Sequence, residues 1–179
     1  LSRLRDLAFE ISKTASGELV DVQRAMAAGL KTGISEETMI GPGGKGLART
    51  AAYYADATDQ TKVDSMRQIA GFYSAYKNQF KPDQTGLFAD LMVKGAYSSR
   101  FADVADYAHE MEFAAPKLAQ MKMKPEDAAT WLAMTGQLQT FGAGRGLRMV
   151  ASQLNMPENQ KVLKKYGLDK LFDKNGLRP

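Results

Sequence analysis

The chain has 179 residues, a formal net charge of +4 and no cysteine, which excludes disulfides, thiol nucleophiles and cysteine-ligated metal sites. No stretch approaches the ~18 consecutive apolar residues of a membrane helix, and a hydrophobic content of 44% is typical of a globular chain. Basic and acidic residues are mostly interleaved, which predicts a solvated mixed surface.

The first 46 residues predict a helical hairpin followed by a hinge. Ser35 precedes Glu36 and Glu37, a pattern that predicts an N-cap with acids in the first helical turn, where the helix dipole favours them. We therefore expect an N-terminal helical hairpin over residues 1–40. Residues 41–46, Gly-Pro-Gly-Gly-Lys-Gly, do not suit a helix and predict a flexible loop or hinge.

Residues 47–179 are expected to form a helical core domain. Apolar residues step by threes and fours from Val63 to Tyr73 and again from Phe101 to Ala115, which is helical spacing. Three segments place proline at a predicted first helical position with an acid next: Lys81-Pro82-Asp83, Lys124-Pro125-Glu126 and Met156-Pro157-Glu158. The predicted fold is all-α, a compact multi-helix domain of about eight to ten short helices.

The two ends of the sequence carry separate predictions. The start lacks an initiator Met and the apolar core of a signal peptide, so we expect a segment of a longer chain. Near the other end, Asn175-Gly176 between apolar residues suits a type I′ turn. We expect a small turn or hairpin there.

His109 is the single histidine and the first candidate for chemistry. Asp106 and Glu112 lie three residues away on the predicted helix, but Ala105 and Phe113, four away, cannot bind a metal ion. No nucleophile or orienting group is signalled beside it. We expect a surface or boundary histidine.

The remaining motifs are incomplete as catalytic or cofactor signatures. Lys45 is followed by Gly46 where a phosphate-binding P-loop needs Ser or Thr, and no strand precedes Gly41. The acid pairs Glu36-Glu37 and Glu126-Asp127 are explained by helix capping. We predict no catalytic residue, no cofactor, no metal site and no small-molecule substrate, and hence a protein that is not an enzyme.

Residues 141–148, Phe-Gly-Ala-Gly-Arg-Gly-Leu-Arg, alternate glycine with other residues. They predict a tight turn between helices or a close backbone crossing. The following helix could present a solvated face or a contact patch for a protein or an anion. The candidate contact residues are Arg145, Arg148, Lys161, Lys164 and Lys165.

The ten methionines leave two interpretations open. Met121, Met123, Met134 and Met149 are among those that could fill the core or form an adaptable binding surface, and we favour the core.

From about residue 84 onward several short pieces follow one another in a recognisable order, and the closing turn is the most specific of them. The pieces are Ala89-Asp90, Ser98-Ser-Arg-Phe-Ala-Asp103, Glu112-Phe-Ala-Ala-Pro116, Met123-Lys-Pro-Glu-Asp-Ala-Ala129, Phe141-Gly-Ala-Gly-Arg-Gly-Leu-Arg148, Ser152-Gln-Leu-Asn-Met-Pro157, Tyr166-Gly167-Leu168, Phe172-Asp-Lys-Asn-Gly176 and Leu177-Arg-Pro179. In this order and spacing they resemble the core region of phage tail tape-measure proteins. The N-terminal part matches more loosely, and the glycine-rich stretch 41–46 departs from the usual pattern.

This resemblance implies a structural segment of a phage or prophage tail protein, acting in tail-length determination and tail assembly. The implied partners are tail tube, tail tip and tail assembly chaperone proteins, together with self-association, and nucleic acid is not expected. The implied location is the tail lumen of the virion, and the host cytoplasm during assembly. The alternative is a stand-alone helical module that binds a protein or nucleic acid through the basic C-terminal part.

Overall fold

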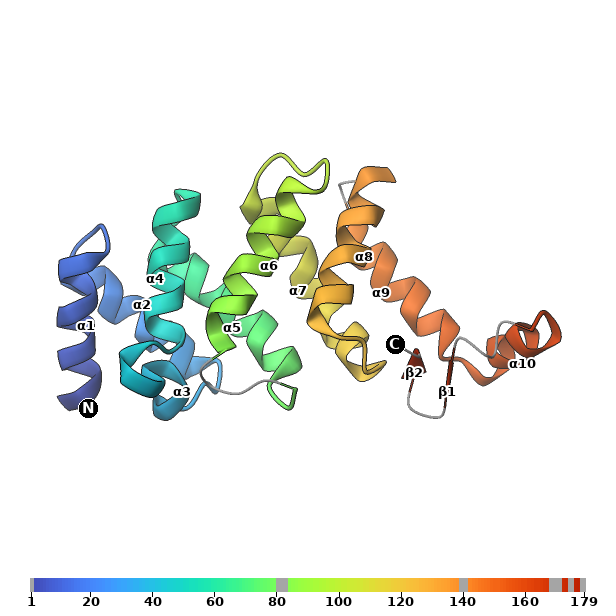
Figure 1. The fold of residues 1–179 in the computed structure, drawn as a ribbon, viewed down its shortest axis with the longest axis horizontal. Coiled ribbons are helices and arrows are strands. Elements are labelled where there is room, and N and C mark those ends of the chain that lie inside the picture. Colours follow the sequence, from blue (N-terminus) through green and yellow to red (C-terminus); the bar gives the residue numbers. More distant parts are fainter. Residues whose placement is uncertain (1, 80–83, 139–141, 168–171, 174–175, 178–179) are drawn as a thin grey trace. The chain divides into compact units, whose positions relative to one another are not determined.

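The computed structural model describes residues 2–79, 84–138, 142–167, 172–173 and 176–177. Within these ranges the elements are α1 (Ser2–Thr14), α2 (Leu19–Lys31), α3 (Glu36–Ile40), η1 (Pro42–Gly44, a 3-10 turn), α4 (Leu47–Thr58), α5 (Lys62–Tyr76), α6 (Thr85–Tyr97), α7 (Val104–Gln120), α8 (Pro125–Leu138), α9 (Ala143–Leu154), α10 (Pro157–Lys165), β1 (Phe172–Asp173) and β2 (Gly176–Leu177) (Figure 1). The predicted all-α class is confirmed. None of the helices in the described part of the chain is long and apolar enough to cross a membrane.

The chain divides into two compact units, residues 1–90 and 91–179, with the boundary inside α6. The glycine-rich stretch 41–46 lies within the first unit. Its role as a hinge between residues 1–40 and 47–179 stays a prediction.

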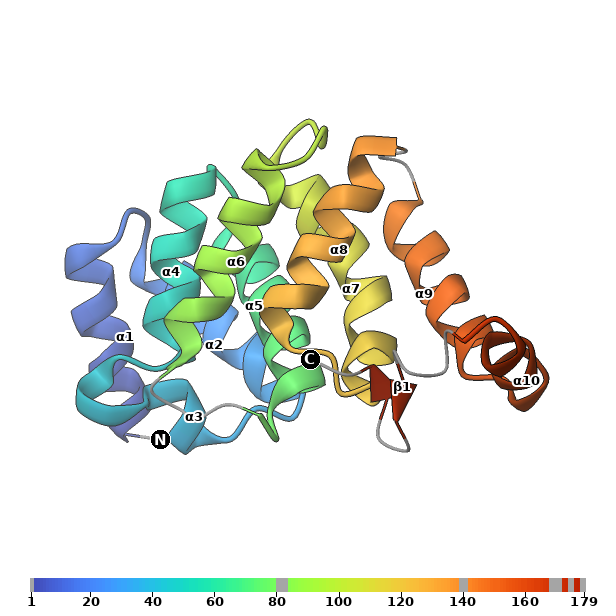
Figure 2. The same cartoon turned by 45° about the vertical axis from the view of Figure 1, so that its right-hand side comes forward.

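The first unit is built around α5. This helix packs against α2 and α4, and α1 packs against α2 (Figures 1 and 2). Its buried residues recur at the predicted helical spacing, including Met66, Ile69 and Tyr73. The rings of Phe72 and Phe88 meet edge to face, 5.1 Å between centroids, and close this core at the start of α6.

The glycine-rich stretch forms a tightly closed turn. The Gly46 N–H donates to the Ile40 carbonyl at 2.8 Å, and the Arg49 Nε donates to the Gly44 carbonyl at 2.9 Å. A Cβ on Gly46 would lie only 2.5 Å from the carbonyl oxygen of Thr38. The stretch forms no α-helix, as predicted, but its backbone is fixed by these contacts.

The second unit is built around α7, which packs against α8 and α9 (Figures 1 and 2). The helix begins at an N-cap, Asp103, whose carboxylate accepts from the Asp106 N–H at 2.8 Å. Its buried stripe contains Tyr107, Met111 and Leu118, all fully buried. This unit carries the surfaces described below.

Local sequence signals set most helix starts. The Ser35 hydroxyl accepts from the Thr38 N–H at 3.1 Å, so the predicted cap is confirmed. Pro125 and Pro157 are the first residues of α8 and α10, also as predicted. The third such segment, Lys81–Asp83, lies outside the described residues.

The predicted hairpin near the C-terminus is present as a two-residue antiparallel pair, in which Phe172 faces Leu177 and Asp173 faces Gly176. Its predicted turn residue Asn175 lies outside the described ranges.

The methionines divide between core and surface. Seven of the ten are buried, namely Met26, Met39, Met66, Met92, Met111, Met121 and Met123. Core filling is therefore confirmed for most of them. Met134, Met149 and Met156 are exposed, and the first two border the grooves described next.

Candidate protein-docking surfaces

A buried carboxylate fixes the start of α9 on the side of α7. Glu110 is 7% exposed, and its two oxygens accept from the backbone N–H groups of Gly142 at 2.9 Å and Gly144 at 2.8 Å. These N–H groups have no partner within the helix, and the positive end of the helix dipole favours an anion at this position. Glu110 thus caps α9 from a neighbouring helix.

The glycines of this segment have separate roles. Gly142 has a φ of +75°, in the left-handed region that glycine adopts without strain. A Cβ on Gly144 would lie 1.8 Å from the carbonyl oxygen of Glu110, so the two backbones cross there without a side chain between them. The predicted close crossing is confirmed. Residues 139–141 of the connection lie outside the described ranges.

The capping role of Glu110 was missed from the sequence, although a signal was present. Glu110 falls three residues after Tyr107 and four before Ala114, which are both buried. An acid inside a buried helical stripe needs hydrogen-bond donors, and helix starts supply them. The sequence alone does not identify Gly142 and Gly144 as those donors.

The five predicted contact residues all lie exposed on α9 and α10. The Arg145 guanidinium sits 4.6 Å above the ring of Phe113, a cation–π contact that fixes it to α7. Within the described residues, Arg148, Lys161, Lys164 and Lys165 have no ion-pair partner. Whether the five act as a contact patch stays a prediction.

The net charge of the protein is concentrated on these two helices. Residues 143–167 contain five basic residues and one acidic residue, so their charge of +4 equals that of the whole chain. The rest of the sequence is balanced, with 19 basic and 19 acidic residues.

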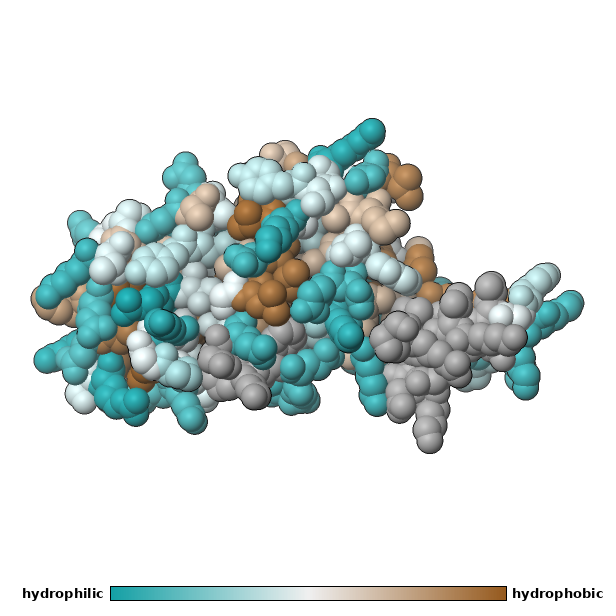
Figure 3. Space-filling model, in the orientation of Figure 1, coloured by the Kyte–Doolittle hydropathy of each residue, from teal (hydrophilic) through white to brown (hydrophobic). Residues whose placement is uncertain are grey.

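An apolar groove of about 300 Å³ lies between α9 and α10. Its lining is almost entirely apolar, formed by Met149, Val150, Leu154, Val162 and Leu163 with Gln153 and Asn159. Met149 is 63% exposed and Val162 is 51% exposed. In Figure 3 the largest hydrophobic patch lies over α6, and smaller hydrophobic areas lie along α9 and at the C-terminal end of α8. We call this site the α9–α10 groove.

α10 contributes nothing to the core. None of its described residues is buried, and among the described elements its main packing partner is α9. The helix therefore forms one wall of the groove rather than part of the folded interior.

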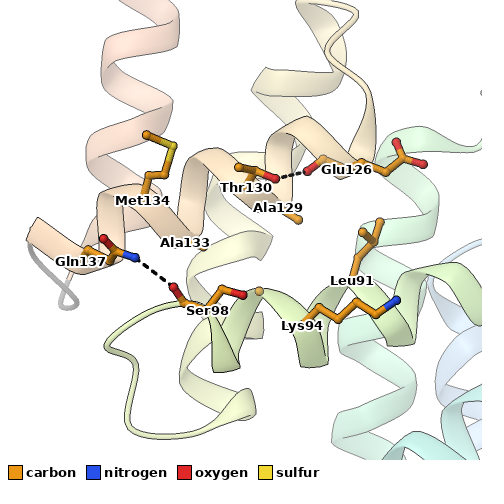
Figure 4. A pocket seen from close by; sticks show the side chains of 10 residues that line it. Leu91, Lys94, Ser98, Glu126, Ala129, Thr130, Ala133, Met134 and Gln137 are labelled. Atoms are coloured by element: carbon orange, nitrogen blue, oxygen red, sulfur yellow. Dashed lines mark hydrogen bonds between the residues drawn. The ribbon is translucent and has the colours of Figure 1, made fainter.

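A second groove, of about 340 Å³, lies between the C-terminal half of α6 and α8 (Figure 4). Its lining includes the small residues Gly95, Ala129 and Ala133, together with Leu91 and Met134. At one end the Gln137 side chain donates to the Ser98 carbonyl at 3.1 Å.

Tyr107 contacts two of the lining residues of this second groove, Ala129 and Gly95. Its hydroxyl donates to the Ala129 carbonyl at 2.7 Å, and a Cβ on Gly95 would lie 2.2 Å from its ring. Burial raises the pKa of the Tyr107 phenol well above its usual value, so it stays a neutral donor. The backbone of the groove at Gly95 and Ala129 is thus held by a buried side chain.

The other candidates have ordinary structural positions. His109 is exposed as predicted, with its Nδ1 3.8 Å from Glu112 and its ring edge-on to Phe113. Among the described residues, no group of three His, Cys, Asp or Glu side chains could hold a metal ion.

The family model described as "Phage-related minor tail protein" matches residues 5–178. No curated protein and no solved structure gives a significant match.

Proposed function

Because the chain belongs to the phage-related minor tail protein family, we propose that it is a structural segment of a tail tape-measure protein. The observation that carries this proposal is the family match over nearly the whole chain, which supports a structural component of the virion tail. In the proposed role the segment contacts tail tube, tail tip and assembly chaperone proteins. It is present in the host cytoplasm during assembly and in the tail lumen afterwards.

Within such a protein, the fold supports docking rather than measuring. A single helix of 179 residues would extend about 270 Å at ~1.5 Å per residue. Here the longest helix, α7, has 17 residues and spans about 26 Å. Helices in each unit pack on one another, so the length of a unit does not increase in proportion to its number of residues. We therefore assign the segment to contact with other tail components.

The first experiment asks whether the segment is part of assembled tails. Purified tails are blotted with an antibody raised against residues 1–179. A band far heavier than 19.6 kDa in tails is the expected result. A band near 19.6 kDa in the soluble fraction, with none in tails, would overturn the tape-measure assignment.

A deletion separates docking from measuring. Removing the segment from the parent gene is expected to abolish or misregulate tail assembly, because a contact is lost. Electron microscopy of the particles gives the readout. Tails that assemble normally and are shortened only in proportion to the missing residues would instead assign it to the ruler.

Several cations on α9 and α10 have no ion-pair partner in the part of the chain that the structure describes, and they favour one alternative, a separate module that binds a protein or nucleic acid through its basic part. Binding to DNA through these residues would weaken steeply with salt, because each neutralised phosphate releases counterions. Titration of duplex DNA at several salt concentrations distinguishes the two. Weak binding without a steep salt slope supports the tail assignment.

A further inference from the structure

We propose that the α9–α10 groove binds an amphipathic helix of another tail protein, whose apolar face is flanked by acidic residues. The proposal rests on the proposed function for the identity of the partner as a tail protein. The surface, its charge and the form of the partner are argued from the second unit alone.

The lining of the groove calls for an apolar occupant. Val150, Val162 and Met149 are each about half exposed or more, and lie together along two packed helices. Exposed apolar residues that are contiguous rather than scattered mark binding surfaces. Methionine adds adaptability, because its unbranched side chain fits different partners.

The size and shape of the groove fit a helix. The lining on α9 runs from Met149 to Leu154, and on α10 from Asn159 to Leu163. Each wall is about 6–8 Å long at ~1.5 Å per residue, which matches about one to one and a half turns of a partner helix. Such a helix would insert two apolar side chains spaced i and i+3 or i+4.

The flanking charges specify acidic neighbours on that helix. Lys165 lies three residues after Val162, so the two side chains are neighbours on one face of α10. Arg148, Lys161 and Lys164 lie on the same two helices and add to the net charge of +4 over residues 143–167. These four cations have no ion-pair partner within the described residues. Acids beside the apolar face of the partner would therefore meet exposed, unpaired positive charge, which favours encounter and sets orientation.

The apolar lining also decides between classes of partner. Nucleic acid would use the cations through its phosphates but leave the lining in water. A membrane surface binds one continuous apolar face, whereas this lining comes from two helices on either side of a shallow groove. A protein helix can cover the apolar lining with its apolar side chains and place its acidic residues near the cations of α9 and α10.

The first test uses a synthetic probe and the 179-residue chain. The probe is a helical peptide of about 15 residues with leucines at i, i+3, i+4 and i+7 and glutamates on both flanks. Its affinity is measured by fluorescence anisotropy. The same leucine pattern with lysine flanks, duplex DNA, and vesicles of phosphatidylglycerol and phosphatidylcholine are measured in parallel. Preferred binding of the glutamate peptide is expected.

Two matched substitutions assign the binding to the groove. Val162→Asp is expected to weaken the glutamate peptide about tenfold or more, since it places a charge in the apolar lining. Val162 is exposed on a helix with no buried residue, so the fold should tolerate the change. Val20→Asp is the control, an exposed valine on α2 in the first unit.

Replacing one lysine of α10 by glutamate tests whether the cations select acidic residues beside the apolar face of the partner. Lys165→Glu, on the same face of α10 as Val162, should weaken the glutamate peptide and strengthen the lysine-flanked one, whereas Lys31→Glu on α2 should change neither. Equal binding of both peptides by the unmodified chain, stronger binding to DNA or vesicles, or equal effects of Val162→Asp and Val20→Asp would each overturn the proposal.

The partner is then identified in assembling phage. A photo-crosslinking amino acid is placed at Val162 of the full-length parent chain, with Tyr53, an exposed residue of α4, as the control position. Crosslinking to an acidic amphipathic helix of another tail protein supports the proposal, while crosslinking to the same chain, to DNA or to lipid overturns it. If the blot finds no segment in tails but the peptide results hold, the proposed function fails and the groove assignment stands.

Discussion

Gly144 and Glu110 interact in two ways, through a close approach of their backbones and through a hydrogen bond from the Gly144 N–H to the Glu110 carboxylate. The α-carbon of Gly144 lies so close to α7 that a Cβ there would be 1.8 Å from the Glu110 carbonyl oxygen. The Gly144 N–H also donates to the Glu110 carboxylate at 2.8 Å. The position of α9, and with it the α9–α10 groove, depends on this pair.

Gly144→Ala is expected to destabilise the protein by about 2–4 kcal/mol, because the added methyl group meets backbone that cannot move aside. Urea unfolding followed by circular dichroism measures the change. Gly146→Ala is the matched control, since nothing lies within 4 Å of its Cβ position on the same helix. That change should be neutral or stabilise by up to about 1 kcal/mol. Equal effects of the two substitutions would contradict the close crossing.

Glu110→Gln is expected to lower the free energy of unfolding by about 1–3 kcal/mol. The substitution removes the negative charge at the helix start and replaces one of the two accepting oxygens with a donor. The control is Glu112→Gln on the same helix, because its 3.8 Å contact with His109 is exposed and should contribute little. Chemical denaturation gives both values, and a Glu110→Gln variant as stable as the control would rule out the capping role.

Acid sensitivity should centre on Asp56 in the first unit. Burial alone would raise the pKa of its carboxyl. Hydrogen bonds from Ser16 and Lys62, together with the Lys62 charge, lower the pKa by more than burial raises it, so the pKa lies below the usual value. The Lys62 Nζ lies 3.0 Å from Asp56 and its side chain is 6% exposed. A lowered pKa in the folded state contributes stability above the unfolded pKa of ~4, and this is lost as the pH falls through the folded pKa.

We therefore expect Asp56→Asn to cost about 1–3 kcal/mol at pH 7, with the difference from the unmodified protein shrinking below about pH 4. Thermal unfolding of both proteins across pH 2–8 measures this difference in stability, with Asp6→Asn on the exposed face of α1 as the control. A stability difference that stays constant across this pH range would mean that the charge of the Asp56 carboxylate does not stabilise the fold.

Backbone amides of α10 should exchange with solvent much faster than those of α7. None of the described residues of α10 is buried, whereas α7 carries the fully buried Tyr107, Met111 and Leu118. Opening α10 exposes little apolar surface, so its opening free energy should be far below that of global unfolding. Hydrogen exchange read by mass spectrometry tests this, and equal protection of the two helices would contradict it.

The features that sequence predicted are those with local causes. The Ser35 cap, the starts at Pro125 and Pro157 and the exposed His109 depend on neighbours within one helical turn. The close crossing was one of two predicted alternatives, the other being a tight turn, because alternating glycines without side chains suit both.

The rest depends on contacts far apart in the chain. Glu110 and Gly144 are 34 residues apart, and no local pattern pairs them. The α9–α10 groove needs Met149 and Val162 on two helices whose packing follows from tertiary structure. The sequence identified the basic residues of α9 and α10 by type and offered Met149 as part of an adaptable surface, but it did not indicate the apolar groove between the two helices.

The uneven burial of α9 and α10 has a mechanical consequence. Tension applied to the chain beyond Tyr166 meets α10 first, and this helix can unravel at low force because it holds no core residue. Resistance rises at the start of α9, where the carboxylate of Glu110 holds two backbone amides. A chain drawn from this side would thus give way in two steps, a soft extension followed by a rupture at α7.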